Sequence, residues 1–281
     1  MNPNFNPNEL YRYTALGRAI DPINYRTNLY IVLLTPFVGV AAGLVTLLNG
    51  GELGAAAAAG FFAAAVVFIA WVYTRDIDPD NNESAFLAGA AALVTAPAPL
   101  AIVSLAAAAP MLRVVSRIVG PVPRLPEYMA VWVLLGAASL LEGGLIAAAA
   151  CVGFVLDGLT PRATRWSWLG AAVSAVLAVV GWIQRPSVLL LPSVPYLLLL
   201  IGIVLLVAFA VVTARSRSFR CTCDDPQVNV VPERIRAAMG FLGLVAALSM
   251  LGGDSLMQSY APVWGSITAV VLWRFKQWVW R

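Results

Sequence analysis

The chain contains no histidine, few charged residues and three cysteines in 281 residues. The lack of imidazole excludes histidine-ligated haem, histidine-based metal sites and histidine general bases, which leaves carboxylates, thiols and tyrosines to carry any chemistry. Cys151 lies in an apolar run, and Cys221 and Cys223 form one CxC pair. Because three thiols make neither a disulfide framework nor a set of zinc ligands, we expect reduced, unliganded cysteines.

Familiar enzyme motifs are also missing. The sequence has no P-loop, no Gly-rich dinucleotide fingerprint, no nucleophile elbow and no HExxH. The formal net charge is +4, but the basic residues are scattered through loops that flank apolar runs. That distribution is typical of membrane topology rather than of a nucleic-acid-binding face, so we expect no nucleic acid partner.

What the chain does have is apolar residues, which make up 60% of it against 11% charged residues, with a mean hydropathy of +0.83. Soluble globular proteins carry roughly a quarter charged residues. Apolar runs near 20 residues recur along the length, and each can cross a hydrocarbon core about 30 Å thick. The composition predicts an all-α polytopic integral membrane protein with no soluble domain.

The organisation follows from where the apolar runs begin. Residues 1–27 form a polar leader with arginine and tyrosine side chains suited to the membrane interface, and 28–281 form a single transmembrane helical domain. The leader does not resemble a cleavable signal peptide. We expect about eight transmembrane helices, or seven if the last run does not span. The expected spans are 29–48, 53–73, 85–109, 128–156, one ending near 182, 189–214, 237–252 and 263–280.

Orientation follows from the loops. With eight spans, most lysines and arginines fall on the side that holds both termini, so the positive-inside rule places the termini in the cytoplasm, here of a bacterial plasma membrane. The connection containing Arg113, Arg117 and Arg124 falls on the opposite side and is the misfit. Its segment 111–119 is amphipathic enough to lie along the membrane surface.

One acidic stretch, 74–84, stands out between the second and third expected spans. Alternating acidic positions and a turn favoured by Pro79 could converge oxygen ligands on a hard cation, Mg²⁺ or Ca²⁺. The candidate metal ligands are Asp76, Asp78, Asp80 and Glu83. The start is like an EF-hand loop, but Asn81 stands where that loop needs glycine and Leu87 where it needs glutamate. The alternative is a solvated turn that pairs with arginines of neighbouring loops, with no cofactor bound.

The layout of the acidic residues resembles that of intramembrane aromatic prenyltransferases, the UbiA-type superfamily. Those enzymes place one acidic motif after the second helix and another after the sixth, where this chain has 75–78 (Arg-Asp-Ile-Asp) and 224–225 (Asp-Asp). The resemblance covers a few residues, and the leading Asn and Asp of the first motif are replaced here by residues 71–74. It implies a Mg²⁺-dependent enzyme acting on lipid or isoprenoid diphosphates.

Two further features lie within apolar runs. Glu142 is a carboxylate deep in the fourth expected span, where a charged group marks either a functional site or a protonated carboxyl bonded to a neighbouring helix. Pro97 and Pro99 remove two backbone donors in the middle of the third span, which predicts a broken or kinked helix. Together they would suit a small-solute or ion transporter.

Three functions therefore remain open. We expect first a non-catalytic integral membrane subunit or scaffold of a larger membrane complex, whose partners are membrane lipids and other subunits or further copies of itself. The alternatives are the Mg²⁺-dependent lipid diphosphate enzyme and the transporter. An enzyme is the less favoured expectation.

Overall fold

The structure is a computed structural model that describes residues 7–23, 25–95, 100–185 and 195–280. Within these ranges the chain is all-helical, and its sole strand-like feature is an isolated bridge between Thr222 and Asn229. The elements in chain order are η1 (Pro7–Arg12), α1 (Arg26–Leu48), α2 (Leu53–Ile77), α3 (Ser84–Thr95), α4 (Ile102–Ser116), α5 (Leu125–Glu142), α6 (Leu145–Leu159), α7 (Arg165–Gln184), α8 (Tyr196–Arg215), α9 (Pro232–Leu251), α10 (Gly253–Ser259) and α11 (Ala261–Val279).

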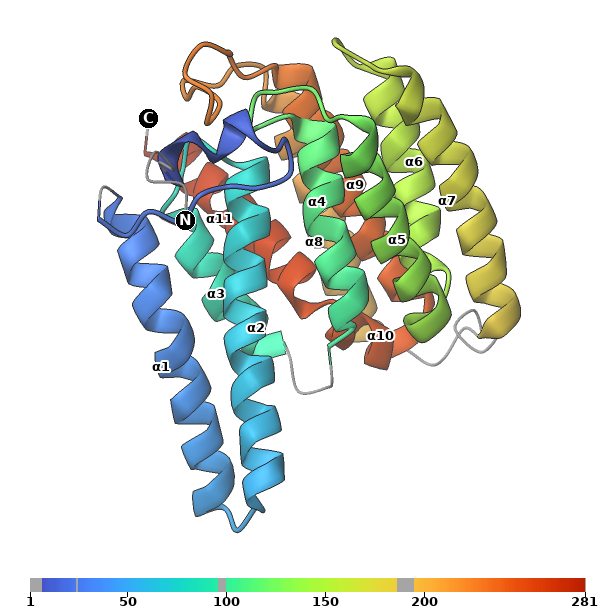
Figure 1. Cartoon of the computed structure of the whole chain (residues 1–281). Coiled ribbons are helices and arrows are strands. Elements are labelled where there is room, and N and C mark those ends of the chain that lie inside the picture. Colours follow the sequence, from blue (N-terminus) through green and yellow to red (C-terminus); the bar gives the residue numbers. More distant parts are fainter. Residues whose placement is uncertain (1–6, 24, 96–99, 186–194, 281) are drawn as a thin grey trace.

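The helices form an up-and-down bundle (Figure 1). The N-terminal segment, the α8–α9 connection and the C-terminal end of α11 gather at one end, called the upper end below. The opposite, lower end holds the α1–α2 turn, the α5–α6 turn and the short helix α10. Successive long helices therefore alternate in direction, as short connections require.

Among the described residues, six helices are long and apolar enough to cross a membrane, fewer than the eight expected. They are α1, α2, α5, α7, α8 and α9. Three others, α3, α4 and α6, are apolar but shorter. Helix α11 has 19 residues, but Arg274 and Lys276 near its end make it less apolar.

The prediction of eight spans was wrong because two expected spans are helix pairs. The run 85–109 contains α3 and α4, and the run 128–156 contains α5 and α6. At the second turn Gly143 has φ +100°, a backbone conformation that favours glycine. A Cβ on Gly144 would clash with the carbonyl oxygen of Ala178, so this turn packs directly on α7. An apolar run cannot by itself distinguish one long helix from two antiparallel ones.

The extra helices move the arginine-rich connection to the other side of the bundle. Arg113 Nε lies 2.9 Å from Asp76 Oδ2, so the end of α4 is level with the end of α2. The misfit of the sequence-based orientation disappears, because this connection shares the upper end with the acidic stretch. The prediction that 111–119 lies on the surface was also wrong, since Met111, Leu112 and Val119 are fully buried.

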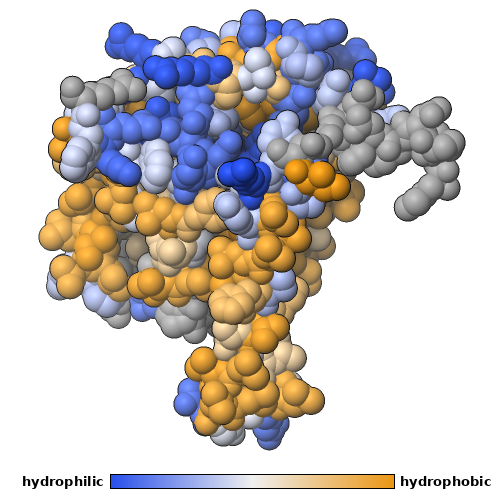
Figure 2. Space-filling model, turned by 90° about the vertical axis from the view of Figure 1, so that its left-hand side faces the viewer, coloured by the Kyte–Doolittle hydropathy of each residue, from blue (hydrophilic) through white to orange (hydrophobic). Residues whose placement is uncertain are grey.

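Helices α1 and α2 form a hairpin that extends below the rest of the bundle (Figure 1). They cross closely because small residues face each other: a Cβ on Gly60 would lie 2.6 Å from the Gly39 carbonyl oxygen, and one on Gly43 would lie 3.1 Å from that of Ala56. The projecting part, made of the lower halves of α1 and α2 and the turn between them, is called the stalk below. Figure 2 shows its largely apolar surface, continuous with an apolar belt under the polar upper end.

The core lies in the body of the bundle and is centred on α4 and α9. Leu105 and Met111 of α4 pack into one buried cluster with Phe241 and Leu242 of α9. Close packing also depends on Gly153 of α6, where a Cβ would lie 2.9 Å from both Met111 and Phe241. Since the upper ends of these helices are fixed by this core, the polar side chains there are held in defined positions.

Candidate functional site

The charged residues of the described chain are distributed unevenly between the two ends of the bundle. Every described arginine and lysine except Arg185 lies at or near the upper end (Figure 1). The carboxylates of the lower end are few: Glu52, Glu142 and Asp254. The upper end is therefore where charged chemistry, binding or pairing takes place.

A row of ion pairs joins the leader, α2, α4 and the α8–α9 connection. Arg18 binds Asp224 in a bidentate manner, with Nε 2.8 Å from Oδ2 and Nη2 2.7 Å from Oδ1. Its Nη1 lies 3.0 Å from Asp76 Oδ1. Arg113 is the last member of the row, and it forms an ion pair with the other carboxylate oxygen of Asp76. We call Arg18, Asp76, Arg113 and Asp224 the leader network, because Arg18 of the leader holds it together.

Arg18 keeps its positive charge in the leader network. Burial lowers the pKa of the Arg18 guanidinium, but Asp224 and then Asp76 raise it further, so its pKa is above the usual value. Asp76 is almost fully buried, and it accepts hydrogen bonds from two guanidinium groups. Charge-assisted bonds of this kind offset the cost of burying both partners when the geometry is good.

Arg75 adjoins the leader network without joining its ion pairs. Its Nη1 donates to Asn28 Oδ1 at 3.0 Å, and its guanidinium lies 4.7 Å from the centroid of the Trp71 ring. Within the described residues, no carboxylate pairs with Arg75. Its buried Nε and the indole Nε1 of Trp71 have no hydrogen-bond partner there either. Such unsatisfied donors are the groups that a bound acceptor would complete.

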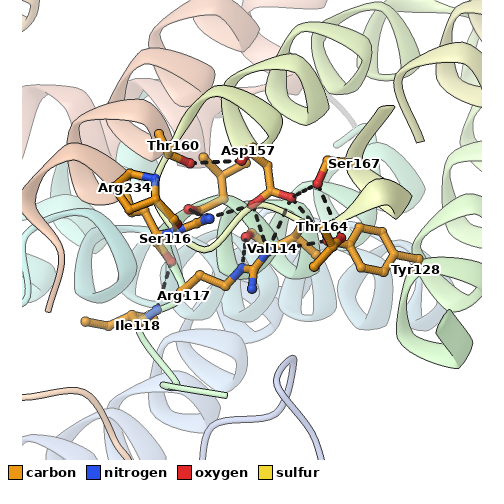
Figure 3. Close-up of polar contacts among 12 residues, drawn as sticks. Val114, Ser116, Arg117, Ile118, Tyr128, Asp157, Thr160, Thr164, Ser167 and Arg234 are labelled. Atoms are coloured by element: carbon orange, nitrogen blue, oxygen red, sulfur yellow. Dashed lines mark hydrogen bonds and ion pairs between the residues drawn. The ribbon is translucent and has the colours of Figure 1, made fainter. Parts of the chain in front are cut away.

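A second cluster joins the upper ends of α4, α5, α6, α7 and α9, and we call it the Asp157 cluster (Figure 3). Asp157 Oδ1 lies 3.0 Å from Arg117 Nη2 and 2.6 Å from Arg234 Nη1. Its Oδ2 accepts from Tyr128 Oη at 3.1 Å and from Ser167 Oγ at 2.5 Å. All five residues are buried. The cluster ties the upper ends of several helices together and leaves Asp157 no free oxygen for a ligand.

The acidic stretch does not converge on one volume, because each carboxylate has a different neighbour. Asp76 belongs to the leader network. Asp78 Oδ1 lies 2.5 Å from Arg274 Nη2 on α11 and accepts from Asn81. Asp80 accepts from the backbone N–H groups of residues 220 and 221, at 3.0 and 2.9 Å. Glu83 is exposed.

The sequence left open that the acidic stretch is a solvated turn that pairs with arginines of neighbouring segments. Asp76 and Asp78 do pair with arginines, but their carboxylates are buried rather than solvated. In the described ranges, no three histidine, cysteine, aspartate or glutamate side chains come together as metal ligands would. A cation held by Asp76, Asp78, Asp80 and Glu83 thus remains a prediction, and it would require these side chains to move.

Burial raises the pKa of Asp78 to about 6, and the opposing effects of Arg274 and Asn81 do not reverse the shift. One reason is that Oδ2 of Asp78 lacks a hydrogen-bond partner in the part of the chain that is described. The thiols of the CxC pair are affected in the same direction, because burial raises the pKa of Cys221 to about 12 and that of Cys223 to about 11. Thiols in this state are poor nucleophiles and poor metal ligands near neutral pH.

Glu142 ends α5 at the lower end of the bundle. Its two carboxylate oxygens accept from the backbone N–H groups of Val103 and Ser104, at 2.9 and 2.7 Å. These are free donors of the first turn of α4, so Glu142 caps a neighbouring helix. Pro97 and Pro99 lie outside the described residues. Their helix-breaking role, and the transporter function based on them and on Glu142, remain predictions.

Sequence reasoning missed the residues that organise the upper end. Arg18, Arg113, Asp157 and Arg234 were each placed in separate loops or span ends, and nothing in the linear order pairs them. The available signal was the surplus of arginines in connections flanked by apolar runs, because a cation next to the hydrocarbon needs a partner or an anionic surface. Asp157 gave a further signal, because it stands at the end of an apolar run.

Two cavities adjoin the leader network. One, of about 360 Å³, lies between α2 and α4 and is lined mainly by apolar side chains below Arg18, Arg75 and Arg113. The other, of about 500 Å³, is polar and lies between the leader and the α8–α9 connection. Both are lined by Arg18 and Arg75, so they meet at these side chains.

Comparison with known proteins gives this chain no relative. No protein-family model matches it, and no similar protein was found among curated sequences or solved structures.

Proposed function

We propose that this chain is a non-catalytic, multi-pass membrane subunit or scaffold of a larger membrane assembly, with membrane lipids and other subunits or further copies of itself as partners. Six apolar helices of spanning length and the 60% hydrophobic composition support insertion in a bilayer. The apolar belt and stalk seen in Figure 2 support the same placement.

The orientation that we propose has the upper end, and with it both termini, on the cytoplasmic side. The support is the charge distribution, in which Arg185 is the single described basic residue at the lower end. The positive-inside rule concerns lysine and arginine in short connections, and the connections here are short. The bundle satisfies that rule more completely than the eight-span topology does.

The observation that carries the proposal is a mismatch in length between the stalk and the rest of the bundle. Helix α2 has 25 residues and rises about 37 Å, whereas α4 and α6 have 15 residues each and rise about 22 Å. A bilayer core is about 30 Å thick. If the tip of the stalk reaches the far surface, the lower ends of α4 and α6 lie inside the hydrocarbon.

The alternative placement, with the lower end of the bundle at the far membrane surface, exposes the stalk to water. With the lower end of the bundle at the far surface, the apolar tip beyond it would project into water, where Leu48 is 85% and Leu53 is 76% exposed. Local bilayer deformation costs a fraction of a kcal/mol per ångström of mismatch. A second protein packed beside the stalk and beneath the bundle removes the conflict in both placements.

A non-catalytic role is supported by the pairing of the carboxylates. Asp157 and Asp76 have both oxygens in bonds to protein donors, and Asp80 binds backbone N–H groups. Side chains held in this way position helices and loops. They offer no general base to a substrate unless a pair first breaks.

The test is photo-crosslinking in native membranes. A photoreactive residue at Leu44 on the stalk should give a crosslinked species heavier than the 29.8 kDa chain. The matched control is the same residue at Val176 on α7, which is similarly exposed but lies away from the stalk. Crosslinks at Leu44 and none at Val176 support the proposal. A monodisperse monomer after mild solubilisation, with no crosslink at Leu44, would overturn it.

A Mg²⁺-dependent enzyme acting on lipid diphosphates is the second candidate, and one observation favours it. Arg18 binds both Asp76 and Asp224, so the two acidic segments meet, although through a guanidinium. If a cation takes the place of Arg18 during turnover, Arg18→Ala should raise Mg²⁺ affinity in calorimetric titration. Absence of Mg²⁺ binding in both the parent chain and the variant would remove this candidate.

A further inference from the structure

The apolar cavity between α2 and α4 is a groove with two chemically different ends. Its lower walls are apolar and half-buried, or exposed at Ala106, so they are in reach of a bilayer chain from the side. They comprise Phe68, Ile69, Val72, Ile102, Ala106 and Ala109. Its upper rim carries Arg18, Arg75, Arg113 and Asp76. Figure 1 shows α2 and α4 side by side, with the leader crossing above them.

The rim carries a positive charge that its carboxylates do not balance. Arg18 and Arg113 are committed to Asp76 and Asp224, whereas Arg75 has a neutral amide and an aromatic ring as its neighbours. An arginine in this position favours an anion with several oxygen acceptors, such as a phosphate.

Unsatisfied donors at the same place supply a second observation. Trp71 is 2% exposed and lines the groove, yet its indole Nε1 has no acceptor among the described residues. The buried Nε of Arg75 is in the same state. Buried donors are usually satisfied by protein or a bound group, and two on successive turns of α2 beside one cavity fit the oxygens of one ligand.

The polar cavity above the rim has room for the polar part of a ligand whose oxygen atoms lie at the rim. It shares Arg18 and Arg75 with the groove and is also lined by Asn28 and Asn82. A ligand that fills both cavities is therefore apolar along α2 and α4, anionic at Arg75 and polar beyond it.

We propose that this groove binds a membrane phospholipid with an anionic headgroup. Its phosphate accepts hydrogen bonds from Arg75 and Trp71, and one acyl chain lies between α2 and α4. A soluble phosphate would use the rim and leave the apolar walls uncovered, so the walls favour the lipid. This proposal does not depend on the existence of a partner subunit.

Native mass spectrometry of the full chain in detergent tests the proposal. The protein is equilibrated with equal amounts of phosphatidylglycerol and phosphatidylcholine that have the same acyl chains. We expect one retained phosphatidylglycerol per chain, about tenfold preferred. Both lipids carry the phosphate, but phosphatidylcholine also carries a choline cation, which the surplus positive charge of the rim repels. Arg75→Gln should reduce the preference about tenfold, and Arg75→Lys should keep part of it.

Two further variants separate the groove from general surface charge. Ala106→Phe fills the groove from an exposed helix position and should lower retention of phosphatidylglycerol about tenfold without changing the charge. Arg215→Gln, the matched control, removes an arginine at the same end of the bundle, where it lies over the Trp278 ring in another cavity. It should leave retention unchanged.

The overturning results are specific. Equal retention of the two lipids, or unchanged retention in both Arg75→Gln and Ala106→Phe, would overturn the proposal. Displacement of the bound lipid by inorganic phosphate at equal concentration would show that the rim is a soluble-anion site instead. If Arg75→Gln does not fold, Arg75→Lys and Ala106→Phe decide the outcome.

Discussion

The upper and lower ends of this bundle stabilise their connections in different ways. At the upper end, segments far apart in the sequence are joined by ion pairs, such as Arg18 with Asp224 and Arg234 with Asp157. Below it, the α5–α6 turn is held by close packing of Gly144 against Ala178, and the crossing of α1 and α2 by that of Gly39 against Gly60. The difference shows that one end is specified by charge pairing and the other by the size of small residues.

The difference extends to what each end offers a ligand or partner. The upper end contains one cluster, around Asp157, whose carboxylate oxygens are both bonded, and one rim, at Arg75, where no described carboxylate pairs with the arginine and an apolar cavity adjoins it. Its binding capacity is therefore concentrated in the groove between α2 and α4. The lower end offers the apolar stalk. Anionic headgroups therefore suit the upper end, and apolar protein or lipid surfaces suit the lower end.

Removing the charge of Asp157 is the largest expected perturbation. Asp157→Asn leaves Arg117 and Arg234 buried together without their anion, and breaking a buried pair in this way costs about 3–5 kcal/mol. We expect a marked fall in the thermal melting temperature of the full chain in detergent.

The matched control for Asp157 is Glu233→Gln, which removes the exposed pair with Arg236 at 3.3 Å. An exposed pair contributes about 1 kcal/mol or less, so the melting temperature should hardly change. If both substitutions had the same small effect, the upper end would not be held by its buried ion pairs.

The next largest effect is the change in folding stability with pH that comes from the ionisation of Asp78. Its pKa is raised by burial to about 6, from an ordinary value of about 4. Between these values the folded chain binds more protons at Asp78 than the unfolded chain, so this contribution to stability is full below about pH 4 and is lost as the pH rises through about 6. It amounts to about 2–3 kcal/mol.

Melting temperatures of the parent chain and of Asp78→Asn between pH 4 and 7 check this. The parent chain should lose more stability over that interval than the variant, because asparagine does not titrate. Parallel pH profiles would show that Asp78 is already ionised at pH 4, as a strong pair with Arg274 alone would predict.

A smaller effect is expected at the lower end from Glu142→Gln. The substitution removes the negative charge that faces the first N–H groups of α4. It also removes one of the two hydrogen bonds, because the amide nitrogen of glutamine cannot accept, and we expect a cost of about 1 kcal/mol. The matched control is Glu52→Gln, since Glu52 precedes α2 without a side-chain capping bond. Equal melting temperatures of the two variants would contradict the capping role.

The sequence was sufficient for the helical class and for most helix ends, because apolar runs and polar connections alternate visibly along the chain. It failed at 85–109 and 128–156, where no charged residue stands between α3 and α4 or between α5 and α6 in the sequence. Gly143 and Gly144 gave the available signal, but glycine pairs also occur inside membrane helices. The missing evidence was tertiary, since the α5–α6 turn is stabilised by packing on α7.

The candidate site was predicted less well than the fold. The acidic stretch drew attention because its residues are consecutive, yet Asp76, Asp78 and Asp80 point to three different partners. The groove depends on Trp71 and Arg75, which read in the sequence as an ordinary interface tryptophan and arginine. What distinguishes them is that the unpartnered Nε of Arg75 and Nε1 of Trp71 belong to residues lining one apolar cavity, which appears only when neighbouring helices are placed.

The most direct test of the central claim, that one end of the bundle gathers the charged connections, is labelling of single cysteines by a membrane-impermeant maleimide in intact cells. Val122→Cys, in the α4–α5 connection, should react only after permeabilisation, whereas Asn49→Cys, in the α1–α2 turn, should react from outside. The eight-span arrangement puts both positions on the same side. Labelling of both from outside would contradict the topology described here.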